Sequence, residues 1–222
     1  MTAASTTAVS EIDMQTDVTK FANFCVYVRG IFEHLHILYE STPDTEKEQL
    51  FDSARVFFGD LNHILIEYVV LQICKITDPE KQFGKRNHTI EFFVNNADFS
   101  ATPEKLVRLK HLQASMDGFR SKLKPARDKL ISHLDRDAVL ADASLGAAAT
   151  SDWSAFWLHL QEFVAILHDR YVGSPLQINR VGLLSDTDGL IKALRQSSYF
   201  ETMLRNGDAT LKKKCLQVAF GD

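Results

Sequence analysis

The sequence is poor in the features that mark secreted and membrane-spanning chains. Its 222 residues contain only three cysteines, an odd number without CxxC spacing, which argues against a disulfide framework and favours a reducing compartment. The most apolar run, residues 64–76, is shorter than the roughly 20 residues that a membrane span needs. The first residues lack the basic and apolar stretches of a signal peptide. These absences predict a cytoplasmic protein without a membrane partner.

Several catalytic and metal-binding motifs are also missing. No GxSxG, P-loop or GxGxxG pattern occurs, so a nucleophile-elbow hydrolase and a classical phosphate-loop enzyme lack support. None of the eight histidines forms HxxxH or HExxH, and His34 and His36 fall on different helix faces. His63 and Glu67 share a face, and we interpret them as a polar pair lining a bundle or its surface. We therefore predict no metal site and no cofactor.

What is present is an ordinary globular composition, 45% hydrophobic and 24% charged, which is enough to bury a core. Apolar residues recur at spacings of three and four along most of the chain. This pattern predicts an all-α fold, an antiparallel helical bundle with a helical C-terminal extension. The expected organisation is a flexible tail over residues 1–16, the bundle over 17–175 and the extension over 176–222.

The predicted helices can be bounded by proline, glycine and capping residues. Thr45 and Glu48 offer a capping box, and Asp186 offers an N-cap further on. Pro125 predicts a kink or a restart within one helix. Residues 78–88 are expected to form a surface loop, 137–150 a connector and 176–181 a doubtful strand. Helices are expected at residues 21–40, 45–77, 90–94, 102–134, 153–167, 186–203 and 212–220.

The net charge of −4 and pI near 6.1 exclude nucleic-acid binding through overall charge, so any such binding must be local. Residues 120–129 contain five basic side chains and one acid, and they run directly into His133. Lys122, Lys124 and Lys129 are therefore the expected phosphate-binding residues, and they become the expected RNA-binding residues if the ligand is RNA. A histidine beside phosphate-binding cations suits phosphodiester chemistry. Charge alone favours the alternative, a solvated basic helix face with an incidental histidine.

The spacing of Arg127 and His133 limits how they can act together. Six residues apart on an ideal helix, they project roughly 120° apart and about 9 Å apart along the axis. A shared phosphate then needs the long arm of Arg127, a distorted turn near Pro125 or a second subunit. A two-fold homodimer would place two copies of the segment face to face.

Residues 127–133 match the Arg-x(4–6)-His signature of the HEPN superfamily, including the polar Asp128 directly after the arginine. The Ile-Thr-Asp-Pro turn at residues 76–79 and the Thr-Ile-Glu-Phe helix start at Thr89 resemble its abortive-infection-like branch. The resemblance spans residues 18 to 170.

This resemblance implies a helical bundle, usually dimeric, and often a metal-independent endoribonuclease of defence or toxin–antitoxin systems. It assigns catalytic roles to Arg127 and His133, with Asp128 in support. An antitoxin or a nucleotidyltransferase is the protein partner it implies, although Asp135 stands where some HEPN toxins carry a modified tyrosine. The alternative is a non-catalytic helical module that binds a protein, nucleotide or RNA partner.

Overall fold

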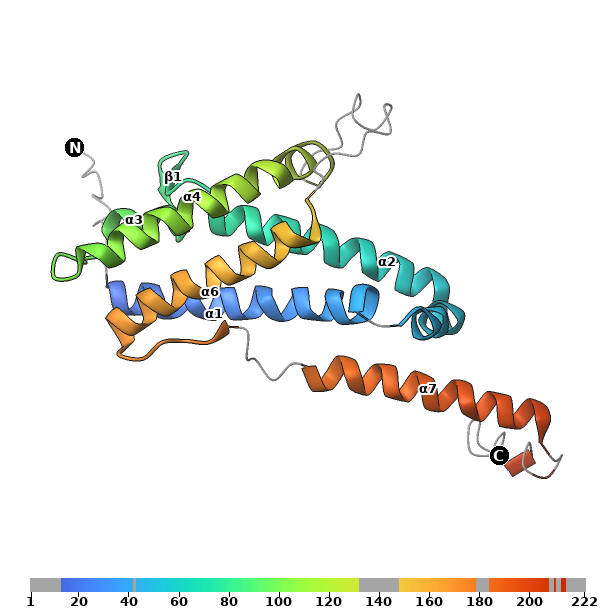
Figure 1. The fold of residues 1–222 in the computed structure, drawn as a ribbon. Helices are drawn as coiled ribbons and strands as arrows, with labels where there is room; N and C mark the ends of the chain where they lie inside the picture. The colour runs from blue at the N-terminus through green and yellow to red at the C-terminus, as the bar shows by residue number, and fades with distance from the viewer. Residues whose placement is uncertain are drawn as a thin grey trace, which may run out of the picture. The chain divides into compact units, whose positions relative to one another are not determined.

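The computed structural model describes residues 13–41, 43–131, 148–178 and 184–207, together with residues 210, 213 and 214. The chain divides into two compact units, one of residues 1–29 and 67–181, the other of residues 30–66 and 182–222. Helices α1 (Met14–Leu35) and α2 (Asp44–Thr77) each contribute to both units. Helices make up most of the described chain, which confirms the predicted all-α fold (Figure 1).

The first unit holds the predicted bundle core. Its centre is aromatic: the ring of Phe21 lies 4.7 Å from that of Phe93 and 6.4 Å from that of Phe163. Helix α4 (Pro103–Ala126) packs along α6 (Thr150–Val172), where the ring of Phe119 lies 5.0 Å from that of Phe156. Besides the start of α1 and the end of α2, the unit contains β1 (Lys81–Gln82), β2 (Lys85–Arg86), α3 (Ile90–Asn96), α4 (Pro103–Ala126), the π-helix η2 (Arg127–Ile131) and α6 (Thr150–Val172).

Two helix ends in this unit follow the sequence signals closely. Thr89 caps α3, because its hydroxyl accepts a hydrogen bond from the backbone N–H of Phe92. Helix α6 ends at Gly173, whose φ of 88° lies in the left-handed region that glycine adopts without strain. Local chemistry therefore sets these boundaries.

The second unit combines the π-helix η1 (His36–Ser41), the start of α2 and helix α7 (Leu184–Asn206). Its buried cluster consists of Leu38, Leu50, Phe58 and Ile191. Ala54 has non-helical angles, φ −160° and ψ 73°, and so kinks α2 one residue after Ser53, whose hydroxyl bonds back to the Leu50 carbonyl.

Several sequence predictions need correction. Helix α2 begins at Asp44, so Thr45 lies inside the helix and is not its N-cap. Asp186 likewise lies in the first turn of α7, where a carboxylate still complements the helix dipole. Residues 176–178 contain no strand. The predicted surface loop at 78–88 contains a two-stranded hairpin, with Lys81 paired to Arg86 and Gln82 to Lys85. Most of the connector and of the last predicted helix lie outside the described residues.

Within the described part of the chain, one helical segment, Leu50–Thr77, is long and apolar enough to cross a membrane by length and composition alone. Core helices of soluble proteins pass the same test. The segment is longer than residues 64–76 because it also includes residues 50–63 of α2, which belong to the second unit. The absence of a membrane partner stays a prediction.

Candidate functional site

A single carboxylate at the end of α2 gathers two arginines from α4 and η2. Asp78 directly follows the last residue of α2, and its Oδ1 accepts hydrogen bonds from Arg120 at 2.5 Å and Arg127 at 2.9 Å. The two arginines are seven residues apart in sequence, and both reach the same carboxylate oxygen. All three side chains are partly buried, with exposed fractions of 16 to 21%. The result is a compact charged cluster inside the first unit.

Arg127 is held by a second carboxylate as well. Its Nη1 lies 3.0 Å from Oδ1 of Asp128, while its Nε is buried without a hydrogen-bond partner among the described residues. Partial burial disfavours the charged guanidinium, but Asp78, the Cys74 sulfur and Asp128 outweigh it and raise the pKa of Arg127. Arg127 is therefore a fixed, permanently charged group.

The backbone at Arg127 departs from the α-helix that the sequence predicted. Helix α4 runs through Pro125 and ends at Ala126, and residues 127–131 form a π-helix. Pro125 has no N–H to donate to the preceding turn, so the α pattern weakens just before this change. Projections based on an ideal α-helix therefore do not apply to Arg127. His133 lies outside the described residues, and its separation from Arg127 is not defined by the structure.

Asp128 connects Arg127 to one of the predicted RNA-binding lysines. Lys124 donates a hydrogen bond to Asp128 Oδ2 from one helical turn earlier. This hydrogen bond, together with the charges of Arg127 and Arg120, lowers the pKa of Asp128. Asp128 thus bridges Lys124 and Arg127.

The other two predicted lysines lie apart from this bridge. Lys122 pairs with Asp152 at the start of α6, 2.8 Å away, and the bond lowers the pKa of Asp152. Lys129 is exposed on η2. The structure therefore brings Arg127, Asp128 and Lys124 together, and it directs Lys122 to a separate contact.

The sequence analysis did not single out Asp78, Arg120 or Cys74 as site residues. Burial raises the pKa of the Cys74 thiol, and the nearby charge of Arg127 reverses only part of this increase. Cys74 therefore packs against the cluster as an uncharged thiol. Two local spacings in the sequence group these residues: the arginines are seven residues apart, and Cys74 lies four residues before Asp78 at the predicted end of a helix.

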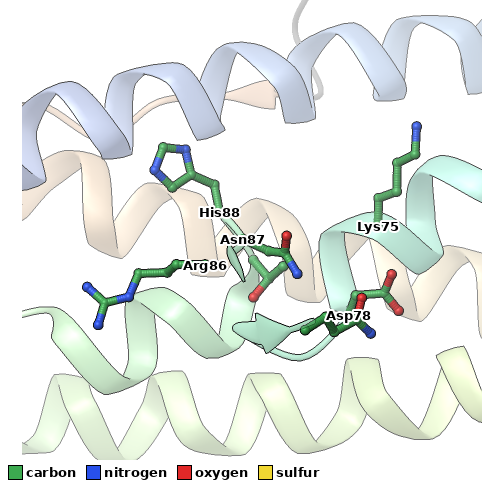
Figure 2. A pocket seen from close by; sticks show the side chains of 7 residues that line it. Lys75, Asp78, Arg86, Asn87 and His88 are labelled. Carbon is green, nitrogen blue, oxygen red and sulfur yellow. The ribbon is translucent and has the colours of Figure 1, made fainter. Parts of the chain in front are cut away.

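Asp78 also lines a pocket of about 470 Å³ on the same unit. Figure 2 shows the side chains of Lys75 and His88 on opposite sides of Asn87. His88 Nε2 lies 2.9 Å from Asp17 of α1. The remaining lining residues are Gln82, Arg86 and Thr89. In the described part of the chain, no three His, Cys, Asp or Glu residues are grouped to hold a metal ion.

Fold and cluster together define a helical-bundle protein with an arginine fixed at the end of its fourth helix. The model of the HEPN AbiU2 family matches residues 18–171, more than two thirds of the sequence. The chain belongs to this family. No curated protein and no solved structure matches it. The family match covers Arg127 and His133 but does not by itself assign them a role.

Proposed function

We propose that this HEPN protein is a metal-independent endoribonuclease that cleaves single-stranded RNA in a defence or toxin–antitoxin setting. The observation that carries the proposal is Arg127, a partly exposed guanidinium held by Asp78 and Asp128 only six residues before His133. A fixed guanidinium beside an imidazole is a suitable pair for stabilising and cleaving a phosphodiester.

The reaction begins with the ribose 2′-hydroxyl, because the proposal includes no metal-bound water and no protein nucleophile. The 2′-oxygen bonds to the adjacent phosphorus while the bond from phosphorus to the 5′-oxygen breaks. One proton leaves the 2′-hydroxyl and one reaches the departing 5′-oxygen, and His133 serves as general base or general acid. Arg127 stabilises the pentavalent phosphorane. The products are a 2′,3′-cyclic phosphate and a 5′-hydroxyl.

The ion pairs of Arg127 leave hydrogen-bond capacity for a phosphate. Each terminal nitrogen of a guanidinium carries two N–H groups, and the contacts to Asp78 and Asp128 use one on each nitrogen. The guanidinium also hydrogen-bonds the Cys74 side chain, and in this proposal an N–H group that remains binds the phosphate without loss of the internal pairs. Asp78 and Asp128 are in this account positioning residues.

The lysines contribute to RNA binding in this proposal. Lys124 and Lys129 flank Arg127 in sequence and supply local positive charge, and Lys122 adds a cation beside the start of α6, where it pairs with Asp152. We further propose a symmetric homodimer that joins Arg127 and His133 from two copies, a cytoplasmic location and restraint by an antitoxin-like protein partner.

A second candidate function has an observation of its own. Asp78 and Asp128 already neutralise Arg127, and Arg120 shares the same Asp78 oxygen. These ion pairs are also consistent with a purely structural role, in which the cluster joins α2, α4 and η2. In that case the chain is a non-catalytic HEPN module that binds a protein, nucleotide or RNA partner.

The test is cleavage of one oligonucleotide sequence prepared as RNA and as DNA, followed by identification of the product ends. We expect cleavage of the RNA alone, with 2′,3′-cyclic phosphate ends, because DNA lacks the attacking hydroxyl. Cleavage of both substrates, or 3′-hydroxyl ends, contradicts the mechanism. Intact RNA at high protein concentration favours the non-catalytic module.

A further inference from the structure

The tip of the hairpin carries an aromatic side chain that the local backbone does not favour. Phe83 has a φ of 49° and Gly84 a φ of 75°, the positive values that a tight hairpin turn requires at both central positions. Asn, Asp and Gly are the usual residues at the first position, and a bulky side chain there is strained. Phe83 is nevertheless present and fully exposed, at 102% of its reference area. Strain of this kind points to a use for the side chain.

The residues around Phe83 are cationic. Lys81, Lys85 and Arg86 lie in the six residues of the hairpin, which contain no acid, although the whole chain has a net charge of −4. All three are exposed. An exposed ring between cations is a combination that suits an unpaired base with its phosphates, because the base stacks and the backbone is attracted.

The base of the hairpin is tied firmly to the bundle. Glu80 is buried, and its carboxylate accepts hydrogen bonds from Asn95 and Asn96, both at 3.1 Å, and pairs with Arg86, also at 3.1 Å. The Glu80 backbone carbonyl accepts a hydrogen bond of 2.7 Å from the N–H of Asn87. The strands therefore hold Phe83 in a preorganised position.

The pocket shown in Figure 2 opens beside this hairpin and connects it to the Arg127 cluster. Gln82 and Arg86 of the two strands line it, together with Lys75 of α2. Lys75 is exposed and makes no ion pair with any described residue. Asp78 lines the same pocket, and both Arg120 and Arg127 neutralise its charge. A polyanion along this surface thus meets an excess of positive charge.

We propose that the hairpin and this pocket form a binding surface for single-stranded RNA. Phe83 stacks on one unpaired base, Lys85 contacts the phosphate beside it, and Lys75 contacts a phosphate in the pocket on the way to Arg127. That this RNA is also a substrate rests on the proposed function, whereas the binding of RNA to this surface is independent of it.

The experiment measures fluorescence anisotropy with a labelled single-stranded RNA of about 12 nucleotides, carrying 2′-O-methyl groups throughout so that it cannot be cut. Phe83→Asn should weaken binding on the order of 5- to 100-fold, the range expected for loss of one stacked base. Phe83→Trp should bind about as well as the unmodified chain. Asparagine suits the left-handed turn, so Phe83→Asn keeps the hairpin, and a melting temperature that is unchanged or higher verifies this.

Three further variants separate stacking from charge. Tyr199 is another exposed aromatic residue, 70% exposed on α7 and far from the hairpin in sequence. Tyr199→Asn should therefore leave the affinity for RNA unchanged. Lys75→Gln and Lys85→Gln should each reduce the slope of log affinity against log salt by about 0.7, the value for one phosphate contact on a single strand.

The inference is overturned by any of three results: no binding by the unmodified chain, equal binding by Phe83→Asn, or binding of duplex RNA with the same dependence on Phe83. Cleavage of unmodified RNA is measured separately. Phe83-dependent binding without cleavage supports the hairpin surface and contradicts the ribonuclease proposal. Cleavage of RNA together with binding that does not depend on Phe83 supports the ribonuclease proposal and contradicts the hairpin surface.

Discussion

Asp78 receives two guanidinium groups on one carboxylate oxygen, and this arrangement decides what each arginine can do. Arg120 contacts Asp78 through one terminal nitrogen, whereas Arg127 contacts both Asp78 and Asp128. A lysine at position 127 has one nitrogen and cannot span two carboxylates while also offering a fork to a phosphate. The structure therefore gives a reason for arginine at position 127 that is independent of the sequence motif.

Replacing Asp78 with asparagine should lower the free energy of unfolding by roughly 1–3 kcal/mol, because two partly buried guanidiniums lose their shared counter-charge. Urea denaturation followed by circular dichroism measures the change. Asp169→Asn is the matched control, since Asp169 pairs with Lys105 in a largely exposed position and should contribute little. Equal losses in the two variants would show that the Asp78 cluster has no special structural role.

At this scale the sequence identified some site residues and missed others for a clear reason. Arg127 and Asp128 could be selected because a local motif and a local charge run include them. Asp78 is 49 residues from Arg127 in sequence, and their contact depends on how α2 and α4 pack. The sequence shows the local spacings of these residues, but a single sequence without covariation does not show that Asp78 pairs with Arg127 across this distance.

Among the elements, the short hairpin depends most on one buried acid. Burial alone would raise the pKa of Glu80, but hydrogen bonds from Asn95 and Asn96 and the charges of Arg86 and Lys81 outweigh it and lower the pKa. In the pH range between the ordinary glutamate pKa and this lower value, the unfolded chain binds more protons than the folded chain. Stability is therefore gained above that range and lost as the pH falls through it.

Glu80→Gln should remove this pH dependence. We expect the unfolding free energy of the unmodified chain to fall more steeply on acidification than that of the variant, while the variant is the less stable of the two at neutral pH. Thermal melts across the acidic range provide the comparison. Parallel curves for the two proteins would mean that Glu80 is not held in its charged form by the folded hairpin.

The helices could be read from the sequence more fully than the other elements. Apolar spacing and the Thr89 signal place α2, α3, α6 and α7 to within about five residues, whereas α1 begins earlier and α4 ends earlier than predicted. Strands of two residues are too short to show alternation, so the hairpin had no pattern to detect. The π-helix at Arg127–Ile131 follows Pro125 and includes the tertiary hydrogen bond from Arg127 to Asp78. The periodicity of apolar residues does not reveal such a contact.

On the scale of the whole molecule, the two units are each built from segments distant in sequence. Residues 30–66 group with 182–222, a combination that composition cannot indicate because no linker marks the change within α1 or α2. The boundaries predicted at residues 16 and 175 stay a prediction.

The proposed homodimer can be tested together with its composite site. Sedimentation at micromolar concentration should give a dimer, and a strict monomer would remove the basis for a shared cleft. Equal amounts of Arg127→Lys and His133→Ala chains should regain about a quarter of full activity, since half the dimers are mixed and each has one intact pair. Mixtures without activity would place both groups in one chain.

Activity should persist after treatment with EDTA, because the proposed chemistry uses the imidazole and guanidinium groups of the chain itself. The measurement compares cleavage rates before chelation, after chelation and after addition of zinc or manganese. A loss with EDTA that either metal restores would contradict the metal-independent mechanism and require a ligand set that our reading of the histidines did not find.

The central claim is that Arg127 and His133 perform phosphodiester cleavage, and single-turnover cleavage of RNA by purified variants tests it most directly. His133→Ala should reduce the rate constant on the order of 10² to 10⁴, the usual worth of general acid–base catalysis, and Arg127→Lys should also be severely impaired. His63→Ala, which removes an exposed histidine of the second unit, should retain the full rate. Equal rates for all four proteins would contradict the account and attribute the cleavage to a contaminant.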